Sequence, residues 1–147
     1  MKIERISIRN FRRLENVAIG IEEGDTVFVG PNNSGKTSAT AAFRSFLGHR
    51  NFCIHDFTVS KIADLDAYGT SGDSKNLPSI DLDIWFKIDP DSIEFGRAFT
   101  LLPNLTDNFD RLGVRLSYQA AKPEKMREAY VAVYPSSEGK PPAKRLS

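Results

Sequence analysis

The sequence predicts an α/β fold, and two observations lead to this prediction. Several short segments alternate apolar with polar residues, as half-buried strands do. One apolar run is followed by a glycine-rich stretch and then by apolar residues at helical spacing. The chain has 147 residues, 40% of them hydrophobic and 27% charged. This composition suits one compact domain, or one lobe of a larger one, and excludes collagen-like and disordered chains.

The charge and the cysteine content further limit the kind of protein and the partners that it can have. The formal net charge is +1, so a nucleic-acid surface has to be a local patch. The single cysteine, Cys53, excludes an intrachain disulfide and a cysteine-rich zinc site, which fits a reducing cytoplasm. Residues 1–9 lack the apolar run of a signal peptide, and no apolar run approaches the roughly 20 residues that cross a bilayer. We therefore expect a cytoplasmic protein that does not span a membrane.

The first third of the chain is predicted to hold three strands and a helix. In each of the first two predicted strands, apolar residues alternate with polar ones, and a polar break at residues 10–16 separates the two strands. The apolar residues are Ile6, Ile8, Val17, Ile19 and Ile21. Thr26–Val29 is a continuous β-branched and aromatic run, which predicts a central strand buried on both faces. The helix that follows ends at Gly48, in the position of a C-terminal cap; its apolar residues are Ala39, Ala42, Phe43, Phe46 and Leu47.

The middle of the chain is less regular. No firm element is predicted between residues 49 and 79, and residues 69–76 have the composition of a polar loop. Ile80–Ile88 alternates strictly, which predicts a half-buried strand of an antiparallel sheet. Asp89 and Pro90 are typical of a helix start, with the helix running through Phe99.

The last part of the chain is predicted to add two strands to the antiparallel sheet. They cover Val114–Tyr118 and Tyr130–Tyr134. Residues 135–147 are rich in Pro, Ser and Lys, which predicts a solvated tail or the start of a continuation. The expected domain therefore covers residues 1–134.

The strongest signal in the sequence is a match to the P-loop pattern G-x-x-x-x-G-K-[ST]. Its residues are Gly30, Pro31, Asn32, Asn33, Ser34, Gly35, Lys36 and Thr37. The match lies between a predicted strand and a predicted helix, which is the context that such a loop requires. The alternative is a glycine turn before a helix with an incidental lysine.

The chemistry of phosphate binding explains these residue types. A loop around a polyphosphate turns its backbone N–H groups inward, so Gly30 and Gly35 stand where a side chain would collide. Asn33 tolerates a left-handed backbone, which related loops often give to glycine. Lys36 is expected to contact the β- and γ-phosphates, Thr37 to bind Mg²⁺, and the start of the helix to add its positive dipole end.

Other motifs separate the P-loop classes. Asp66–Gly69 and Asp110–Gly113 match the D-x-x-G of GTPases, but the guanine-reading N-K-x-D is absent from the sequence. Small kinases do not usually place a segment like residues 2–25 ahead of the loop. Both classes are therefore disfavoured.

The order of segments resembles the amino-terminal lobe of ABC-type ATPases of the SMC, RecF and OLD (overcoming lysogenisation defect) groups. The resemblance lies in Ile8–Arg13, two strands, and then the P-loop. Leu112–Tyr118, followed by a charged piece and Ala129–Val131, resembles the OLD group more than RecF. The resemblance implies a P-loop NTPase fold, with a mixed sheet and an antiparallel β subdomain, that binds ATP and Mg²⁺.

The resemblance covers only the first half of such an ATPase. The family pairs the P-loop with a Walker B strand that ends in an acidic pair, and with an S-G-G signature supplied by a second subunit. Neither occurs in this sequence, since Ile80–Asp83 alternates and places Asp81 and Asp83 on one face of an exposed strand. We therefore expect no ATP hydrolysis by this chain alone.

The resemblance also points to residues outside the loop. It places Arg12 and Arg13 near the nucleotide, as contacts to phosphate or adenine, although solvated charges at a strand end are an equal alternative. His55–Phe57 falls where the family has a glutamine that contacts Mg²⁺ through water, so Asp56 is a candidate for that role. A basic group can face nucleic acid, although such charges more often solvate a helix; its residues are Arg44, His49 and Arg50.

The expected function is that of an ATP-binding module of an OLD-like ATPase. In that family such modules dimerise around ATP and control a nuclease that acts on DNA, often in phage defence. Two alternatives remain: an SMC- or RecF-like head that binds DNA, and a nucleotide sensor or assembly subunit that does not hydrolyse ATP. The expected partners are therefore a second copy or a second ATPase lobe, DNA and a nuclease.

Overall fold

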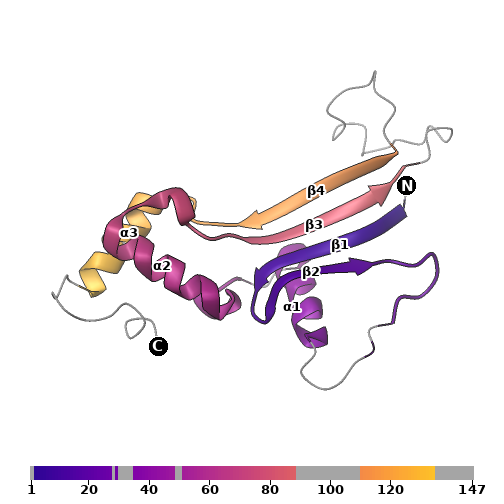
Figure 1. Cartoon of the computed structure of the whole chain (residues 1–147), viewed down its shortest axis with the longest axis horizontal. Helices are drawn as coiled ribbons and strands as arrows, with labels where there is room; N and C mark the ends of the chain where they lie inside the picture. The colour runs from indigo at the N-terminus through magenta and orange to yellow at the C-terminus, as the bar shows by residue number, and fades with distance from the viewer. Residues whose placement is uncertain (1, 28, 30–34, 49–50, 89–109, 135–147) are drawn as a thin grey trace.

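The structure is a computed structural model, and it describes residues 2–27, 29, 35–48, 51–88 and 110–134. Four strands form one antiparallel sheet in the order β2-β1-β3-β4 (Figure 1). They are β1 (Lys2–Phe11), β2 (Leu14–Gly20), β3 (Ile80–Lys87) and β4 (Arg111–Tyr118). The helices are α1 (Lys36–Leu47), α2 (Val59–Ser71) and α3 (Pro123–Val133), with short 3₁₀ turns η1 (Ile54–Asp56) and η2 (Ser74–Asn76).

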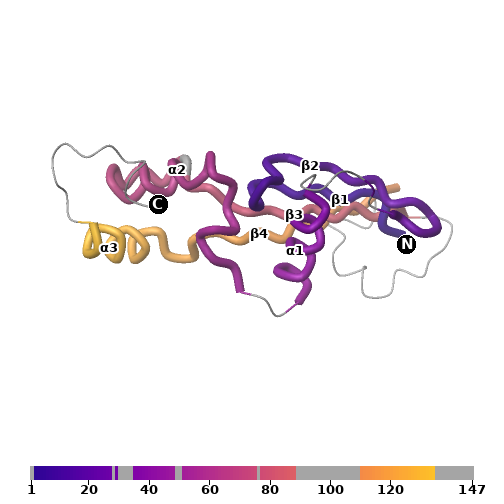
Figure 2. Tube along the Cα trace, turned by 90° about the horizontal axis from the view of Figure 1, so that it is seen from below, coloured from indigo at the N-terminus to yellow at the C-terminus, as the bar shows by residue number. Residues whose placement is uncertain are grey.

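The main core lies between the sheet and helix α1. The register pairs Ile6 with Ile84 and Ile8 with Leu82, so the apolar residues of β1 and β3 share one face. Helix α1 covers that face and buries three alanines, Ala39, Ala41 and Ala42. Seen along the sheet, α1 lies on one side of it, while α2 and α3 lie side by side beyond one end (Figure 2). The small alanine side chains allow α1 to approach the strands closely.

The opposite face of the sheet is polar and partly buried. Asp83 of β3 pairs with Arg9 of β1 (Nη1 to Oδ2, 2.9 Å) and with Arg115 of β4 (Nε to Oδ1, 2.7 Å). Asp81 accepts hydrogen bonds from Ser117 (2.6 Å) and Ser79 (3.1 Å). The prediction that Asp81 and Asp83 share a face is confirmed, but the predicted exposure is wrong, because Asp83 is only 5% exposed. Neighbouring arginines compensate the cost of burying these carboxylates.

Most predicted strands and the first helix are confirmed. The polar break between the first two strands is shorter than expected: β1 and β2 meet in a hairpin whose turn is Arg12–Arg13, with Phe11 and Leu14 both buried. The predicted helix that begins at Asp89 and the tail at 135–147 lie outside the described residues.

The predicted central strand at Thr26–Val29 is wrong. The described residues Thr26, Val27 and Val29 belong to no strand, and Val27 and Val29 are 76% and 88% exposed. A central strand needs a hydrogen-bonded neighbour on each side, and none of the described strand pairings or bridges involves residues 26, 27 or 29. The two valines of this segment are therefore not buried as predicted.

The second half of the chain is more helical than predicted. Tyr130–Tyr134, predicted as a strand, belongs to α3, which starts at Pro123 and packs on α2 through Tyr130. Residues 69–76, predicted as a loop, contain the end of α2 and the turn η2. Within the described residues, no helix is both long and apolar enough to cross a membrane.

Candidate nucleotide-binding site

Three residues of the P-loop motif, Gly35, Lys36 and Thr37, are described, and they open helix α1. Gly35 is the N-cap residue with φ +89°, a left-handed conformation that favours glycine, and its carbonyl accepts the N–H of Ala39 (2.9 Å). Lys36 is the first helical residue and Thr37 is exposed. The first N–H groups of a helix have no partner within the helix, so this end favours an anion. Gly30, Pro31, Asn32, Asn33 and Ser34 lie outside the described residues.

The β1–β2 hairpin packs directly against this helix start. A Cβ atom built on Gly35 would lie 2.8 Å from Cδ2 of Leu14, so the two residues are in contact and any side chain at Gly35 would require Leu14 to move. Leu14 follows the hairpin turn, which contains Arg12 and Arg13. The structure therefore brings the turn of the hairpin next to the N-terminus of α1.

The hairpin turn has an unusual backbone. Asn10 and Arg12 both have positive φ angles, +58° and +53°, a conformation that non-glycine residues rarely adopt. The contacts that hold it come from the segment at η1: the N–H of Arg12 donates to the carbonyl of Asp56 (2.7 Å), and the N–H of Thr58 donates to the carbonyl of Asn10 (3.1 Å). A backbone conformation of this energetic cost persists only where neighbouring contacts hold it, as these two hydrogen bonds do.

The side chain of Arg12 forms an ion pair with Asp56. Its Nε and Nη2 atoms both approach Oδ1 of Asp56, at 2.9 and 2.8 Å. Oδ2 accepts from the backbone N–H of Cys53 (3.1 Å) and from its thiol (3.5 Å). Burial raises the pKa of Asp56, but the hydrogen bonds from Arg12 and Cys53 outweigh it and hold the pKa below its usual value. Asp56 is therefore an ionised carboxylate that is 1% exposed.

The hydrogen bonds of Asp56 make it a less suitable metal ligand than the sequence predicts. Both oxygens of Asp56 already accept hydrogen bonds from Arg12 and Cys53, so a Mg²⁺ ion at Asp56 would have to displace them. Thr37 lies at the start of α1 with an exposed side chain, as a ligand to a nucleotide-bound Mg²⁺ requires. The described residues contain no group of three or more His, Cys, Asp or Glu that suits a metal ion. Thr37 fits the predicted metal role better than Asp56 does.

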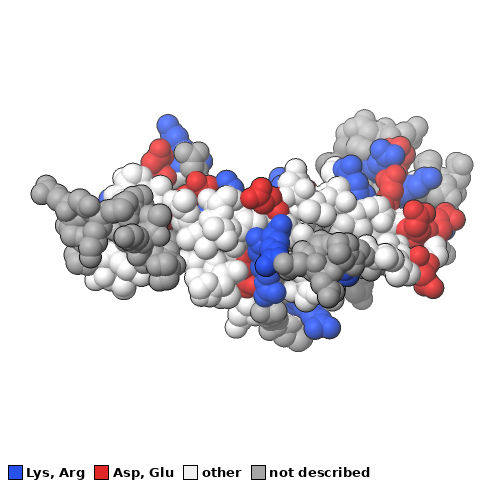
Figure 3. Space-filling model, turned by 60° about the horizontal axis from the view of Figure 1, so that its bottom comes forward, with Lys and Arg blue, Asp and Glu red and all other residues white. Residues whose placement is uncertain are grey.

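The other charged candidates lie apart from one another. Arg13 is exposed in the hairpin turn, next to Arg12. Arg44 is exposed in the last turn of α1, while His49 and Arg50 lie outside the described residues. On the face shown in Figure 3, basic side chains gather midway along the molecule, next to acidic ones. This local grouping is consistent with a chain whose net charge is only +1.

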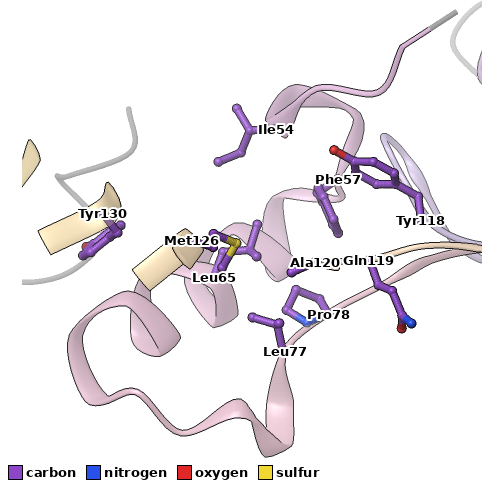
Figure 4. A pocket seen from close by; sticks show the side chains of 10 residues that line it. All are labelled: Ile54, Phe57, Leu65, Leu77, Pro78, Tyr118, Gln119, Ala120, Met126 and Tyr130. Atoms are coloured by element: carbon purple, nitrogen blue, oxygen red, sulfur yellow. The ribbon is translucent and has the colours of Figure 1, made fainter. Parts of the chain in front are cut away.

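A separate cavity of about 220 Å³ lies between α2, α3 and the ends of β3 and β4. Its lining is mostly apolar, with side chains of Leu65, Leu77 and Met126 around it (Figure 4). None of its described lining residues belongs to the P-loop motif. The cavity is therefore distinct from the candidate nucleotide site.

The sequence did not predict the partnership of Arg12 with Asp56. The two residues are 44 positions apart, and neither stands in a periodic pattern that indicates the other. The only signal was that the resemblance assigned both residues to the same site. A contact of this kind depends on how the hairpin packs on η1, which local sequence does not reveal.

The P-loop pattern stands at the start of helix α1, beside an antiparallel sheet, whereas the strand expected before it is not found among the described residues. Residues 1–142 match the family model of the AAA ATPase domain, so the chain belongs to that family. The predicted α/β class with an antiparallel β subdomain is confirmed.

Two similar proteins are both named RecF. The chain is 39% identical over 70 residues to the DNA replication and repair protein RecF of Colwellia psychrerythraea, a match covering 48% of this chain and 17% of that protein. It is 48% identical over 42 residues to RecF of Chlorobium luteolum, covering 29% and 11%. The matched part thus spans less than a fifth of either RecF protein. The expected likeness to RecF is supported, whereas the OLD subgroup is not.

Among solved structures, one comes from work on the ATP-driven dimerization and DNA-stimulated activation of SMC ATPases. It superposes with a TM-score of 0.46 at 17% identity, over 92% of this chain and 82% of that one. This score is too low to define the fold by itself.

Proposed function

We propose that the chain binds ATP with Mg²⁺ at the N-terminus of α1. The observation that supports this most is the left-handed Gly35 followed by Lys36 and Thr37 at the start of a 12-residue helix, in a chain of the ATPase-domain family. Lys36 would hold the β- and γ-phosphates, and Thr37 would bind the Mg²⁺ ion. The backbone of residues 33–37 would surround the phosphates, with Arg12 and Arg13 as further phosphate contacts.

The test is binding of labelled ATP by the full-length protein and its Lys36→Ala variant. We expect the variant to lose ATP binding with an unchanged circular dichroism spectrum, because it loses the ammonium group but no core residue. Lys61→Ala on α2, which removes a half-buried lysine paired with Asp64, is the matched control and should bind as the wild type does. Equal affinity of Lys36→Ala and wild type would refute the site.

We further propose that this lobe works in an RecF-like or SMC-like assembly. The chain lacks a Walker B run and an S-G-G signature, so turnover requires a second lobe and a second copy that closes on the γ-phosphate. The similarity to RecF favours DNA as the partner and the cytoplasm as the compartment. Binding of DNA by the protein that strengthens when Mg–ATP is added would support this proposal.

Control of a nuclease in phage defence, as in the OLD group, is a second candidate. Its support is the sequence resemblance of Leu112–Tyr118 and Ala129–Val131. DNA cleavage by the full-length protein with Mg²⁺ favours this candidate, and ATP binding without turnover or cleavage favours the non-hydrolysing sensor.

A further inference from the structure

We infer that Asp56 is a positioning residue of the nucleotide site, which fixes Arg12 beside the start of α1 for contact with the phosphates. This inference rests on the proposed ATP-binding function. It assigns Asp56 a role through Arg12 rather than through a metal ion, and the contacts of Leu14, Arg12 and Asp56 lead to it.

The first step is location. Leu14, two residues after Arg12, contacts Gly35 at the N-cap of α1. The residue at the turn of the β1–β2 hairpin therefore lies next to the helix end that favours an anion. The hairpin reaches this place through fixed pairing, with Phe11 opposite Leu14 in the register.

The second step is rigidity. Asp56 accepts from Arg12 at three points: the backbone N–H (2.7 Å), Nε (2.9 Å) and Nη2 (2.8 Å). The carboxylate is itself fixed by Cys53, whose N–H and thiol approach Oδ2. The guanidinium also lies over the ring of Phe11, 5.1 Å from its centroid. Because the side chain is ordered before a ligand arrives, less conformational entropy is lost on binding.

The third step is the remaining bonding capacity of Arg12. A guanidinium carries five N–H donors, and those directed to Asp56 come from Nε and Nη2. Its Nη1 group is left for an acceptor other than Asp56, and the side chain is 29% exposed. An arginine held by a carboxylate along one edge suits binding of phosphate oxygens with the other edge.

A purely structural role for the ion pair is the alternative, and a double-mutant cycle separates the two. We would measure the dissociation constant of labelled Mg–ATP for the full-length wild type, Asp56→Asn, Arg12→Gln and the double variant, with thermal midpoints recorded without nucleotide. We expect each single variant to bind ATP about tenfold more weakly, and the double variant no more weakly than Arg12→Gln.

The matched control is Asp83→Asn. Asp83 is a second buried aspartate paired with arginines, but it lies on the sheet face opposite α1. Its variant should lower the thermal midpoint and leave the affinity for ATP unchanged. If Asp56→Asn does not fold, Asp56→Glu keeps the charge but shifts the guanidinium, and it should weaken ATP binding while retaining the fold.

Three results overturn the inference. They are unchanged affinity in folded Asp56→Asn, unchanged affinity in folded Asp56→Glu, and an equal further loss when Asp56→Asn is added to Arg12→Gln. The proposed function fails separately, through a wild type that binds no ATP or through a Lys36→Ala variant that binds normally.

Discussion

Asp83 is held between two arginines on the polar face of the sheet, and its ionisation contributes to folding. Burial raises the pKa of Asp83, but the hydrogen bonds from Arg115 and Arg9 outweigh it and hold the pKa below 3.8. A carboxyl whose pKa is lower in the folded state stabilises the protein above its unfolded pKa. That contribution is lost as the pH falls through the folded pKa.

We predict that Asp83→Asn lowers the free energy of unfolding by about 1–3 kcal/mol at pH 7. The difference from the wild type should shrink as the pH falls below 3.8 toward the folded pKa, because the carboxyl is protonated first in the unfolded chain and then in the folded one. Urea unfolding at a series of pH values measures both effects. Glu23→Gln, which removes an exposed partner of Lys2, should change little at any pH. A difference that stays constant with pH would contradict the prediction.

At the scale of elements, helices α2 and α3 are joined by a buried contact that their sequences do not indicate. Tyr130 donates its hydroxyl to Oδ1 of Asp66, whose buried Oδ2 has no hydrogen-bond partner among the described residues. A Cβ atom on Gly69 would lie 2.5 Å from the ring of Tyr130, so Gly69 provides the space for that ring. Tyr130 therefore contributes both a hydrogen bond and ring packing to the contact between the two helices.

We predict that Tyr130→Phe lowers the free energy of unfolding by about 1–3 kcal/mol, because it removes the hydroxyl donor of a fully buried carboxylate. Urea unfolding monitored by circular dichroism measures the loss. Tyr134→Phe is the matched control, since its ring lies 5.2 Å from that of Tyr130 on the same helix end. Equal stabilities of the two variants would show that the contact with Asp66 contributes nothing.

These elements show where sequence reasoning succeeds and where it fails. The strands β1, β3 and β4 were predicted because one of their faces is apolar and their period of two is long enough to be distinct. Helix α2 was missed because its buried residues include Asp66 and Gly69, which do not form an apolar stripe. The segment predicted as a strand at Tyr130–Tyr134 is only five residues long. This segment instead forms part of a helix that packs on α2.

Part of the candidate site could be predicted from the sequence and part could not. The glycine, lysine and threonine at the start of α1 were predictable because they are adjacent in the sequence and their spacing has a physical cause. The pairing of Arg12 with Asp56 was not predictable, because the packing of the hairpin on η1 creates it. Tertiary contacts between distant segments are the part that a single sequence leaves open.

At the scale of the whole molecule, the sheet separates two environments. One face is apolar and covered by α1, and the other holds charged groups that compensate one another; the α2–α3 pair lies beyond one end (Figure 1). Residues 26, 27 and 29, which precede the P-loop motif, belong to neither environment. This segment is where the sequence and the structure differ most.

The last prediction concerns that segment. We predict that Val29→Ala changes the free energy of unfolding by less than about 0.5 kcal/mol, because Val29 is 88% exposed. Ile8→Ala, which truncates a fully buried residue of β1, should cost about 2–5 kcal/mol in the same urea titration. A strand buried on both faces, as the sequence predicts, would instead make Val29→Ala cost about 1–3 kcal/mol. A loss of that size would mean that Val29 packs in a core and that the central strand exists.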